Sequence, residues 1–234
     1  MSDSVSYQRH DDIAVVTIDD GKANALSAAV LAAVQSGLDQ AEGDGSRAAV
    51  LIGRPGVFSG GFDLGVMRSG DVRAIGGLVT DGGELVSRIY RSEMPVVGAC
   101  SGHAVAAGAL VMLACHHRVG AQGETRISLP ETAISMILPD WGVVIAEERI
   151  TRRHLPQAVI ESRVYDPAGA VEAGFLDQVV APEDLLASAL AEARRLGALD
   201  RTAYAGNAAK LRGAGIERLA AAVARDRAAV AALA

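Results

Sequence analysis

Two short turns rich in small residues, each placed after an apolar run, constrain the fold of this chain most strongly. Residues 48–52 (AAVLI) precede the turn at 57–64 (VFSGGFDL), and residues 95–100 (PVVGAC) precede the turn at 101–108 (SGHAVAAG). Short apolar runs bounded by such turns are typical of buried strands. Small side chains let a ligand approach the main chain, and the N–H groups of a helix's first turn attract negatively charged oxygen. The two turns therefore predict an oxyanion hole, in which two main-chain N–H groups donate to one carbonyl oxygen.

The rest of the chain alternates between strand and helix patterns. Residues 5–18 alternate around Asp11-Asp12, which predicts a hairpin. Helix 71–91 is weakened by its glycines, which suggest a segment able to move or bend as a lid or pocket wall. We expect further strands at 117–121, 126–129 and 175–180, and further helices at 27–42, 106–115, 141–149, 155–163, 166–173, 182–196 and 200–234. This order predicts an α/β core followed by an α-helical C-terminal part.

Composition excludes several classes of protein. A chain of 234 residues fits one domain, with or without a small appendage. Its apolar runs are too short to span a bilayer, and the polar start at residues 1–4 does not resemble a secretory signal, so we expect a cytoplasmic protein. The net charge of −6 argues against nucleic-acid binding. Cys100 and Cys115 lie in apolar surroundings and are expected to be packed thiols, and no metal site is expected.

The two turns carry a resemblance to a known family. Residues 58–64 (FSGGFDL) resemble the first oxyanion motif of the crotonase (enoyl-CoA hydratase/isomerase) superfamily, and residues 101–108 resemble its second. The resemblance covers the chain from Ile13 to about Leu185. It implies the crotonase spiral of ββα units over residues 1–181, with residues 182–234 as a helical region for trimerisation or pocket cover. It also implies a homotrimer or a dimer of trimers.

The same resemblance implies the substrate class and two donor residues. Phe62 and Ala107 take the two positions whose main-chain N–H groups would donate to the oxyanion. The substrate would be an acyl-CoA thioester, so that coenzyme A enters as part of the substrate and no separate cofactor is expected. Removing a proton beside a thioester carbonyl, or adding water to the neighbouring double bond, places negative charge on that oxygen. Two fixed N–H groups stabilise that charge.

The sequence departs from the family's hydratases at one of two catalytic glutamates. The position that follows a proline after the next strand matches Glu131, but Leu110 occupies the earlier position. Hydration divides the activation of water and the delivery of a proton between two groups, whereas one base can move a proton between two carbons. The sequence therefore favours double-bond isomerisation. The alternative is a catalytically silent acyl-CoA binder that has kept the pocket and lost one acid.

Two other side chains are candidates for the missing acid. Asp140 precedes a predicted helix, and its simpler role is to cap that helix. His103 lies inside the second turn, where packing or hydrogen bonding is the simpler role, although a histidine titrates near neutral pH.

The resemblance also implies a surface for coenzyme A. Lys22 is the candidate partner of the CoA phosphates, and a solvated lysine in a turn is its alternative role. Asp63 is expected to cap the helix after the first turn. Lys210 and Arg212 are placed to reach the phosphates only if the C-terminal helices lie nearby. The main chain around Ser59, Gly60 and Leu64 is implied to line the adenine and pantetheine channel. The residues implied to contact coenzyme A are thus Lys22, Ala23, Ser59, Gly60 and Leu64.

Overall fold

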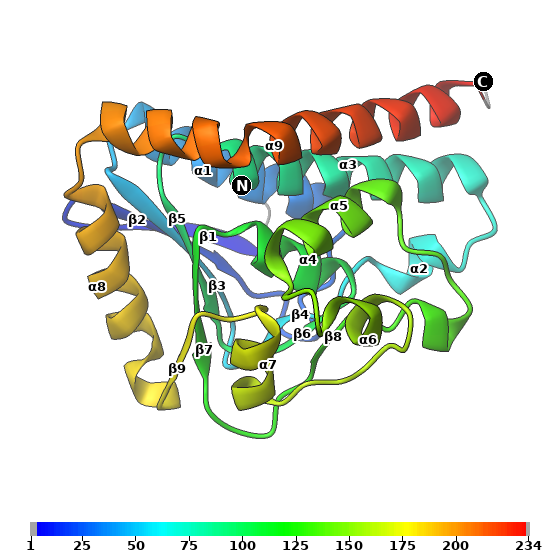
Figure 1. Ribbon diagram of the computed structural model, residues 1–234, viewed down its shortest axis with the longest axis horizontal. Coiled ribbons are helices and arrows are strands. Elements are labelled where there is room, and N and C mark those ends of the chain that lie inside the picture. The colour runs from blue at the N-terminus through cyan, green and yellow to red at the C-terminus, as the bar shows by residue number, and fades with distance from the viewer. Residues whose placement is uncertain (1–3, 233–234) are drawn as a thin grey trace.

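The computed structural model describes residues 4–232 and contains two sheets (Figure 1). The larger sheet has the strand order β1-β2-β3-β5-β7-β9. Only the β1–β2 pair is antiparallel, as the predicted hairpin requires, and the other pairs are parallel. The strands are β1 (Val5–His10), β2 (Ile13–Ile18), β3 (Ala48–Gly53), β5 (Val96–Cys100), β7 (His117–Ala121) and β9 (Gln178–Val180).

A small parallel sheet lies beside the large one, and the chain enters it after β3, β5 and β7. Its strands are β4 (Gly56–Ser59), β6 (Gly102–Val105) and β8 (Ile127–Ser128). They follow β3, β5 and β7 in sequence, and each leads to a helical segment, so the chain repeats a ββα unit. Strands β4 and β6 approach each other so closely at Gly102 that a Cβ atom added there would lie 2.0 Å from the carbonyl oxygen of Gly56. The predicted spiral of ββα units is thus confirmed.

Helices cover both faces of the large sheet, which explains why its strands are apolar at successive positions. In β2, Ala14 and Val16 belong to one buried cluster, and Ile13 and Val15 belong to another. In Figure 1, α8 lies alone on one side of the sheet and the other large helices lie on the opposite side. These helices are α1 (Ala28–Gly43), α3 (Val72–Arg91), α4 (Ala107–Ala114), α5 (Asp140–Arg149), α8 (Leu185–Gly197) and α9 (Arg201–Ala231).

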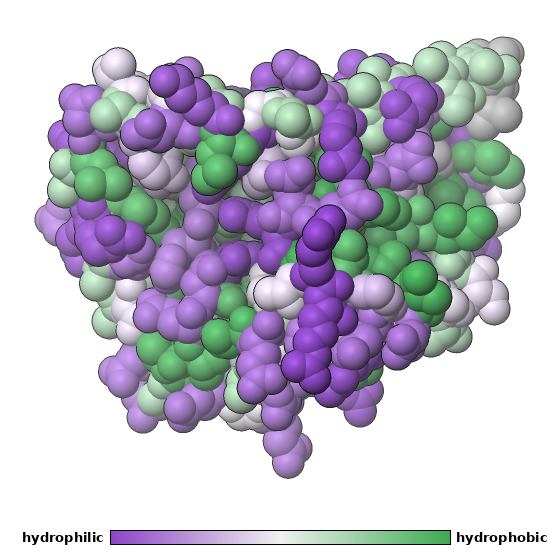
Figure 2. Space-filling model, viewed as in Figure 1, coloured by the Kyte–Doolittle hydropathy of each residue, from purple (hydrophilic) through white to green (hydrophobic). Residues whose placement is uncertain are grey.

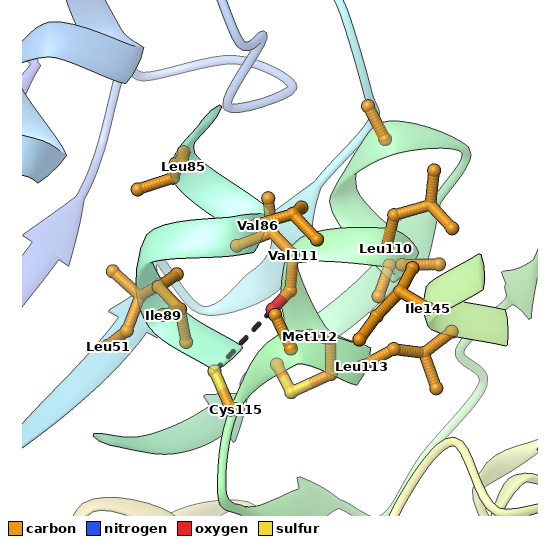
Figure 3. Close-up of a cluster of buried hydrophobic side chains, with 14 of the residues drawn as sticks. Leu51, Leu85, Val86, Ile89, Leu110, Val111, Met112, Leu113, Cys115 and Ile145 are labelled. Carbon is orange, nitrogen blue, oxygen red and sulfur yellow. Dashed lines mark hydrogen bonds between the residues drawn. The ribbon is translucent and has the colours of Figure 1, made fainter. Parts of the chain in front are cut away.

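The larger cluster forms where α3 lies against α4. Val86 of α3 lies beside Val111 of α4 in Figure 3, and Ile89 of α3 lies beside Leu51 of β3; all four side chains are buried. The Cys115 thiol donates a hydrogen bond to the Val111 carbonyl oxygen at 3.5 Å (Figure 3). Burial raises the pKa of both thiols, Cys100 and Cys115, to about 12, and neither forms a disulfide. Both are packed thiols, as the sequence predicts.

Helix α3 is continuous despite its glycines, because large side chains occupy the space that the glycines leave. A Cβ atom on Gly82 would lie 2.5 Å from the Phe62 ring, and one on Gly83 would lie 2.8 Å from the Trp141 indole. A Cβ atom on Gly76 would likewise lie 2.6 Å from the Val230 side chain of α9. The glycines therefore serve close packing, and the expectation of a mobile lid has no support in these contacts.

The C-terminal residues form two helices that pack on the body of the protein. Helix α8 contributes Leu185 and Ala189 to the core on one face of the sheet, and α9 contributes Leu219 and Val223 on the other. Helix α9 runs alongside α3 across the top of Figure 1. Residues 1–3, and residues 233–234 of the helix expected to end at 234, lie outside the described residues. The domain boundary at residue 181 stays a prediction.

The remaining helices are short, and one loop between them is apolar and exposed. The predicted helix at 155–163 ends early, at Val159, and Ser162 beyond it has a positive φ of 52°. Figure 2 shows apolar surface on the right, where α2 and the loop between β8 and α5 lie in Figure 1. In that loop Ile137 is 94% exposed. The short helices are α2 (Leu64–Met67), α6 (Leu155–Val159) and α7 (Pro167–Ala173), with 3-10 turns at Thr132–Ile134 and Pro182–Asp184.

No helix among residues 4–232 is both long enough and apolar enough to cross a membrane. Within the same residues, no three His, Cys, Asp or Glu side chains are grouped so that they would hold a metal ion.

Candidate active site

The main chains of the two glycine-containing turns, at residues 57–64 and 101–108, contact each other. A Cβ atom on Gly61 would lie 3.1 Å from the Val105 carbonyl oxygen and 3.5 Å from the Ala107 nitrogen. A Cβ atom on Gly108 would lie 2.5 Å from the Ser59 carbonyl oxygen. Gly61 also has a φ of +97°, which L-residues with a side chain rarely adopt. Glycine at these two positions therefore lets the turns come into contact, and it brings Gly61, the residue before Phe62, beside Ala107.

The main-chain N–H groups of Phe62 and Ala107 are both available to a ligand. Leu26 forms a parallel bridge with Phe62, in which its N–H donates to the Gly61 oxygen at 2.9 Å and its oxygen accepts from Asp63 at 3.3 Å. This pattern turns the Phe62 N–H away from Leu26, and no hydrogen bond within residues 4–232 uses it. Ala107 is the first residue of α4, where an N–H has no acceptor inside the helix.

Ala106, which precedes Ala107, is held in a strained conformation. Its φ is +53° and its ψ is −128°, a combination that glycine adopts and alanine avoids. Its neighbours fix it there: its N–H donates to the Ser128 oxygen at 3.0 Å, and its oxygen accepts from Leu110 at 3.1 Å. Strain of this kind is common where a backbone atom is held for function.

Replacing Ala106 with glycine is expected to stabilise the protein. The relief of strain at a positive φ exceeds the entropy that glycine adds to the unfolded chain, for a net gain of about 1 kcal/mol. Urea unfolding of the Ala106→Gly variant measures the change. Ala104→Gly, in the adjacent strand β6, is the matched control and is expected to destabilise. A loss of stability in both variants would show that Ala106 is not strained.

Glu131 is a buried carboxyl group with no charged neighbour that perturbs it. It follows β8 and Pro130, and only 8% of the residue is exposed. Burial raises the pKa of Glu131 to about 7, and a hydrogen bond from its own main-chain N–H opposes the shift. Its Oε2 atom is buried and has no hydrogen-bond partner among the described residues. A carboxyl group that titrates near neutral pH is suited to both accept and release a proton.

Leu110, which the resemblance matches to the second glutamate of hydratases, lies in apolar packing. Leu110 is 1% exposed, and its Cδ1 atom lies 3.2 Å from where a Cβ atom on Gly142 would be. The same point is 3.1 Å from Leu138. The helix that carries Leu110, α4, holds no ionisable side chain. No proton carrier therefore stands at this position.

Both candidates for a replacement acid form contacts within the protein. Asp140 is the first residue of α5, Pro139 precedes it as the N-cap, and no side chain caps this helix. The capping role predicted for Asp140 is wrong, because its exposed carboxylate pairs instead with Arg225 of α9 at 3.0 Å. In the second turn, the His103 Nδ1 atom accepts a hydrogen bond from the Arg126 N–H at 2.9 Å. His103 thus has the hydrogen-bonding role that the sequence favours.

Two of the five residues implied to contact coenzyme A, Ala23 and Gly60, line one groove. The groove has a volume of about 580 Å³, and its lining includes Ala23, Gly60, His103 and Arg126. Lys22 is exposed beside Ala23, and its carbonyl oxygen accepts hydrogen bonds from Arg54.

The other residues implied to contact coenzyme A differ in their positions. Leu64 is 58% exposed at the start of α2, while Ser59 is fully buried and therefore lies beneath the groove rather than in its wall. Asp63 caps α2, as predicted, because its Oδ1 atom accepts from Gly65 at 2.7 Å and from Val66 at 3.3 Å. Arg212 stacks on the Tyr90 ring, with its guanidinium carbon 5.3 Å from the ring centroid, so it is engaged within the protein.

One residue of the site was missed from the sequence. Asn24 is fully buried, has a φ of +51°, and donates through its side chain to the carbonyl oxygens of Val57 and Phe58 at 3.1 Å. Asparagine is enriched among non-glycine residues with positive φ, so its place in the turn Asp-Gly-Lys-Ala-Asn was the available signal.

Comparison with known proteins agrees with this geometry. The family described as enoyl-CoA hydratase/isomerase matches residues 8–230. Human mitochondrial enoyl-CoA delta isomerase 1 is 33% identical over 181 residues, which are 76% of this chain and 60% of that protein. The chain thus spans less than two thirds of the length of this relative.

Solved structures resemble the whole chain. That of the probable enoyl-CoA hydratase EchA3 of Mycobacterium tuberculosis has a TM-score of 0.93 and 36% identity, and the match covers 97% of this chain and 95% of that one. Human mitochondrial delta3-delta2-enoyl-CoA isomerase has a TM-score of 0.89 and 31% identity, with coverage of 97% and 92%. On its sequence match, its spiral of ββα units and the meeting of its two turns, the chain belongs to the enoyl-CoA hydratase/isomerase family of the crotonase superfamily.

Proposed function

We propose that the protein moves the double bond of an enoyl-CoA thioester, with Glu131 as its only proton carrier. The observation that carries the proposal is the contrast between two positions. Glu131 is buried, and its pKa lies near 7, while buried Leu110 fills the place of the second acid. The human isomerase is among the similar proteins, which supports the same chemistry.

The reaction requires one base and one oxyanion hole. The Glu131 carboxylate removes a proton from the α-carbon of a 3-enoyl-CoA, and the electron pair of that C–H bond moves into a dienolate. Its negative charge sits on the thioester oxygen, where the N–H groups of Phe62 and Ala107 donate to it. The protonated Glu131 then returns the proton to the γ-carbon, which leaves a 2-enoyl-CoA and restores the carboxylate. No electron acceptor or second substrate is consumed.

The substrate supplies the only coenzyme in this proposal. Coenzyme A would lie in the groove beside Ala23, Gly60 and His103, with Lys22 near its phosphates. The acyl chain would then reach Glu131 past the meeting point of the two turns. We propose no further cofactor and no metal.

We further propose that copies of the chain associate, as a trimer or a dimer of trimers. The apolar loop after Glu131 supports this, since Ile134, Met136 and Ile137 are 54%, 40% and 94% exposed in the single chain. Large exposed apolar patches commonly mark association surfaces. The cytoplasmic location stays a prediction, since the human relatives are mitochondrial proteins.

Two substrates separate isomerisation from the alternatives. Incubation with 3-enoyl-CoA is expected to raise the absorbance of the conjugated thioester, because the double bond moves next to the carbonyl. Incubation with 2-enoyl-CoA is expected to lower this absorbance much more slowly, because hydration lacks its second acid. Fast loss of conjugation would identify a hydratase. Tight binding of both thioesters with neither change would identify the silent acyl-CoA binder.

A further inference from the structure

The loop of residues 20–26 and the first oxyanion turn are joined along their length by hydrogen bonds. The Gly60 N–H donates to the Ala23 oxygen at 2.8 Å, and the Leu26 N–H donates to the Gly61 oxygen at 2.9 Å. Asn24 lies between these two contacts. The loop therefore borders the turn on the side opposite to the direction of the Phe62 N–H.

The side chain of Asn24 holds the strand that leads into this turn. Its Nδ2 atom donates to the carbonyl oxygens of Ile18 at 2.8 Å and of Val57 and Phe58 at 3.1 Å. Asn24 is fully buried, so these contacts are shielded from water. Its Oδ1 atom accepts from the Asp20 N–H at 3.0 Å, which ties the same side chain to the start of the loop.

Ser59 continues the connection to the oxyanion donor. Its hydroxyl donates to the Asn24 carbonyl oxygen at 2.8 Å and accepts from the Gly61 N–H at 3.1 Å. Ser59 is also fully buried. Gly61 directly precedes Phe62, so the hydroxyl fixes the plane of the peptide group immediately before the one that carries the Phe62 N–H.

Asp20 anchors the other end of the connection. Its carboxylate accepts from the main-chain N–H groups of Lys22 at 2.7 Å, Asn24 at 2.8 Å and Ala25 at 3.0 Å. Burial acts to raise the pKa of Asp20, but these three donors and Arg54 outweigh it and hold the pKa below its usual range. The anchor is therefore ionised at neutral pH.

We propose that Asn24 and Ser59 are positioning residues that set the direction of the Phe62 N–H toward the thioester oxygen. This inference rests on the proposed function, because it presumes that Phe62 is an oxyanion donor. The residues do not touch the substrate themselves. They act through the Gly61 peptide, and the same contacts fix the loop of Lys22 and Ala23 that borders the CoA groove.

The test compares Ser59→Ala with Ser46→Ala. Ser46 is a matched control, because it is 2% exposed and its hydroxyl donates to Asp44 at 2.7 Å, in the loop between α1 and β3. Ser59→Ala is expected to lower kcat about tenfold, with KM changed less than about twofold. A misdirected N–H donor mainly loses stabilisation of the negative charge that forms on the thioester oxygen during the reaction, and it affects binding of the neutral substrate less. Ser46→Ala is expected to change neither constant.

A second readout does not depend on turnover. Butyryl-CoA with an isotope-labelled carbonyl has no double bond to move, and hydrogen bonds to its carbonyl oxygen lower the C=O stretching frequency in infrared difference spectra. The shift on binding is expected in the unchanged protein and in Ser46→Ala, and to fall by about half in Ser59→Ala. If Ser59→Ala does not fold, Ser59→Cys is the second variant, because it keeps a similar volume with a weaker hydrogen-bond donor. Its kcat and carbonyl shift are expected to lie between those of the unchanged protein and those expected for Ser59→Ala.

The outcomes separate this inference from the proposed function. A full carbonyl shift and an unchanged kcat in Ser59→Ala would overturn the positioning role and leave the oxyanion hole intact. No shift in the unchanged protein would overturn the oxyanion hole, and the positioning role with it. An equal loss in Ser59→Ala and Ser46→Ala would show only a general effect of removing a buried hydroxyl, and would also overturn the inference.

Discussion

Replacing Glu131 with glutamine is expected to reduce the isomerisation of 3-enoyl-CoA by about a thousandfold or more. The amide cannot accept the α-proton, and α4, which carries Leu110, has no ionisable side chain to replace Glu131. Acid–base catalysis by one positioned group contributes about a hundred- to ten-thousandfold, and here a single group carries both proton transfers. Initial rates with Glu131→Gln, and with the exposed control Glu172→Gln, measure the effect.

The same variant is expected to be more stable than the unchanged protein above neutral pH. The pKa of Glu131 rises from 4.5 to about 7 in the folded state, so the fold favours the protonated form. The cost of ionising it is absent at pH values below 4.5, grows as the pH rises toward 7, and is complete above that. By linkage this cost is on the order of 3 kcal/mol. Urea unfolding at about pH 8 should reveal the gain, and unfolding at about pH 4 should show none.

The pH dependence of the unchanged enzyme follows from the same pKa. The base must be deprotonated to act, so kcat/KM is expected to rise with pH and to level off above a midpoint near 7. Activity retained in Glu131→Gln, or a rate independent of pH across this range, would remove Glu131 from the mechanism.

Replacing Gly108 with alanine is expected to cost about a hundredfold in kcat and about 2 kcal/mol or more in the free energy of unfolding. The new Cβ atom would lie 2.5 Å from the carbonyl oxygen and 2.7 Å from the Cβ atom of Ser59, so the two turns must move apart. The groups that resist are main-chain atoms of a buried turn, which cannot give way as a flexible side chain does. A shift of about 1 Å in a catalytic group is enough for a loss of this size.

Gly206→Ala is the control for the general effect of replacing a helical glycine with alanine. Gly206 is exposed on α9, and a Cβ atom there would meet nothing within 4 Å. Alanine is the better helix former, so this variant is expected to gain about 0.5–1 kcal/mol and to keep full activity. Paired measurements of kcat and of thermal unfolding compare the two variants. Full activity in Gly108→Ala would show that the close approach of the turns is dispensable.

The sequence predicted the local features of this fold well. Apolar runs before the glycine turns identify β3 and β5, and the helix predicted from residue 27 is capped by Ser27, whose hydroxyl accepts from the Val30 N–H at 3.3 Å. The proline before Glu131 placed that residue at a strand end. These features depend on residues that are adjacent in the sequence, so the sequence alone is enough to predict them.

Features that depend on distant partners could not be read in this way. Asp140 pairs with Arg225, which is 85 residues away, so its helix begins without the predicted cap. The glycines of α3 resemble weak points of a helix until the rings of Phe62 and Trp141 are seen against them. The raised pKa of Glu131 likewise comes from burial by the whole fold. Each of these requires the tertiary structure.

The strand order of the large sheet has a consequence for synthesis on the ribosome. Apart from excursions into the small sheet, each strand pairs with the one made before it, so β1, β2, β3, β5, β7 and β9 can assemble in the order of translation. Helices α8 and α9 follow all of these strands: α8 covers β3 and β5, and α9 covers α3 and α5, which are made much earlier. A nascent chain that has not yet released α9 leaves the apolar sides of those helices bare, and is then most exposed to aggregation and chaperone capture.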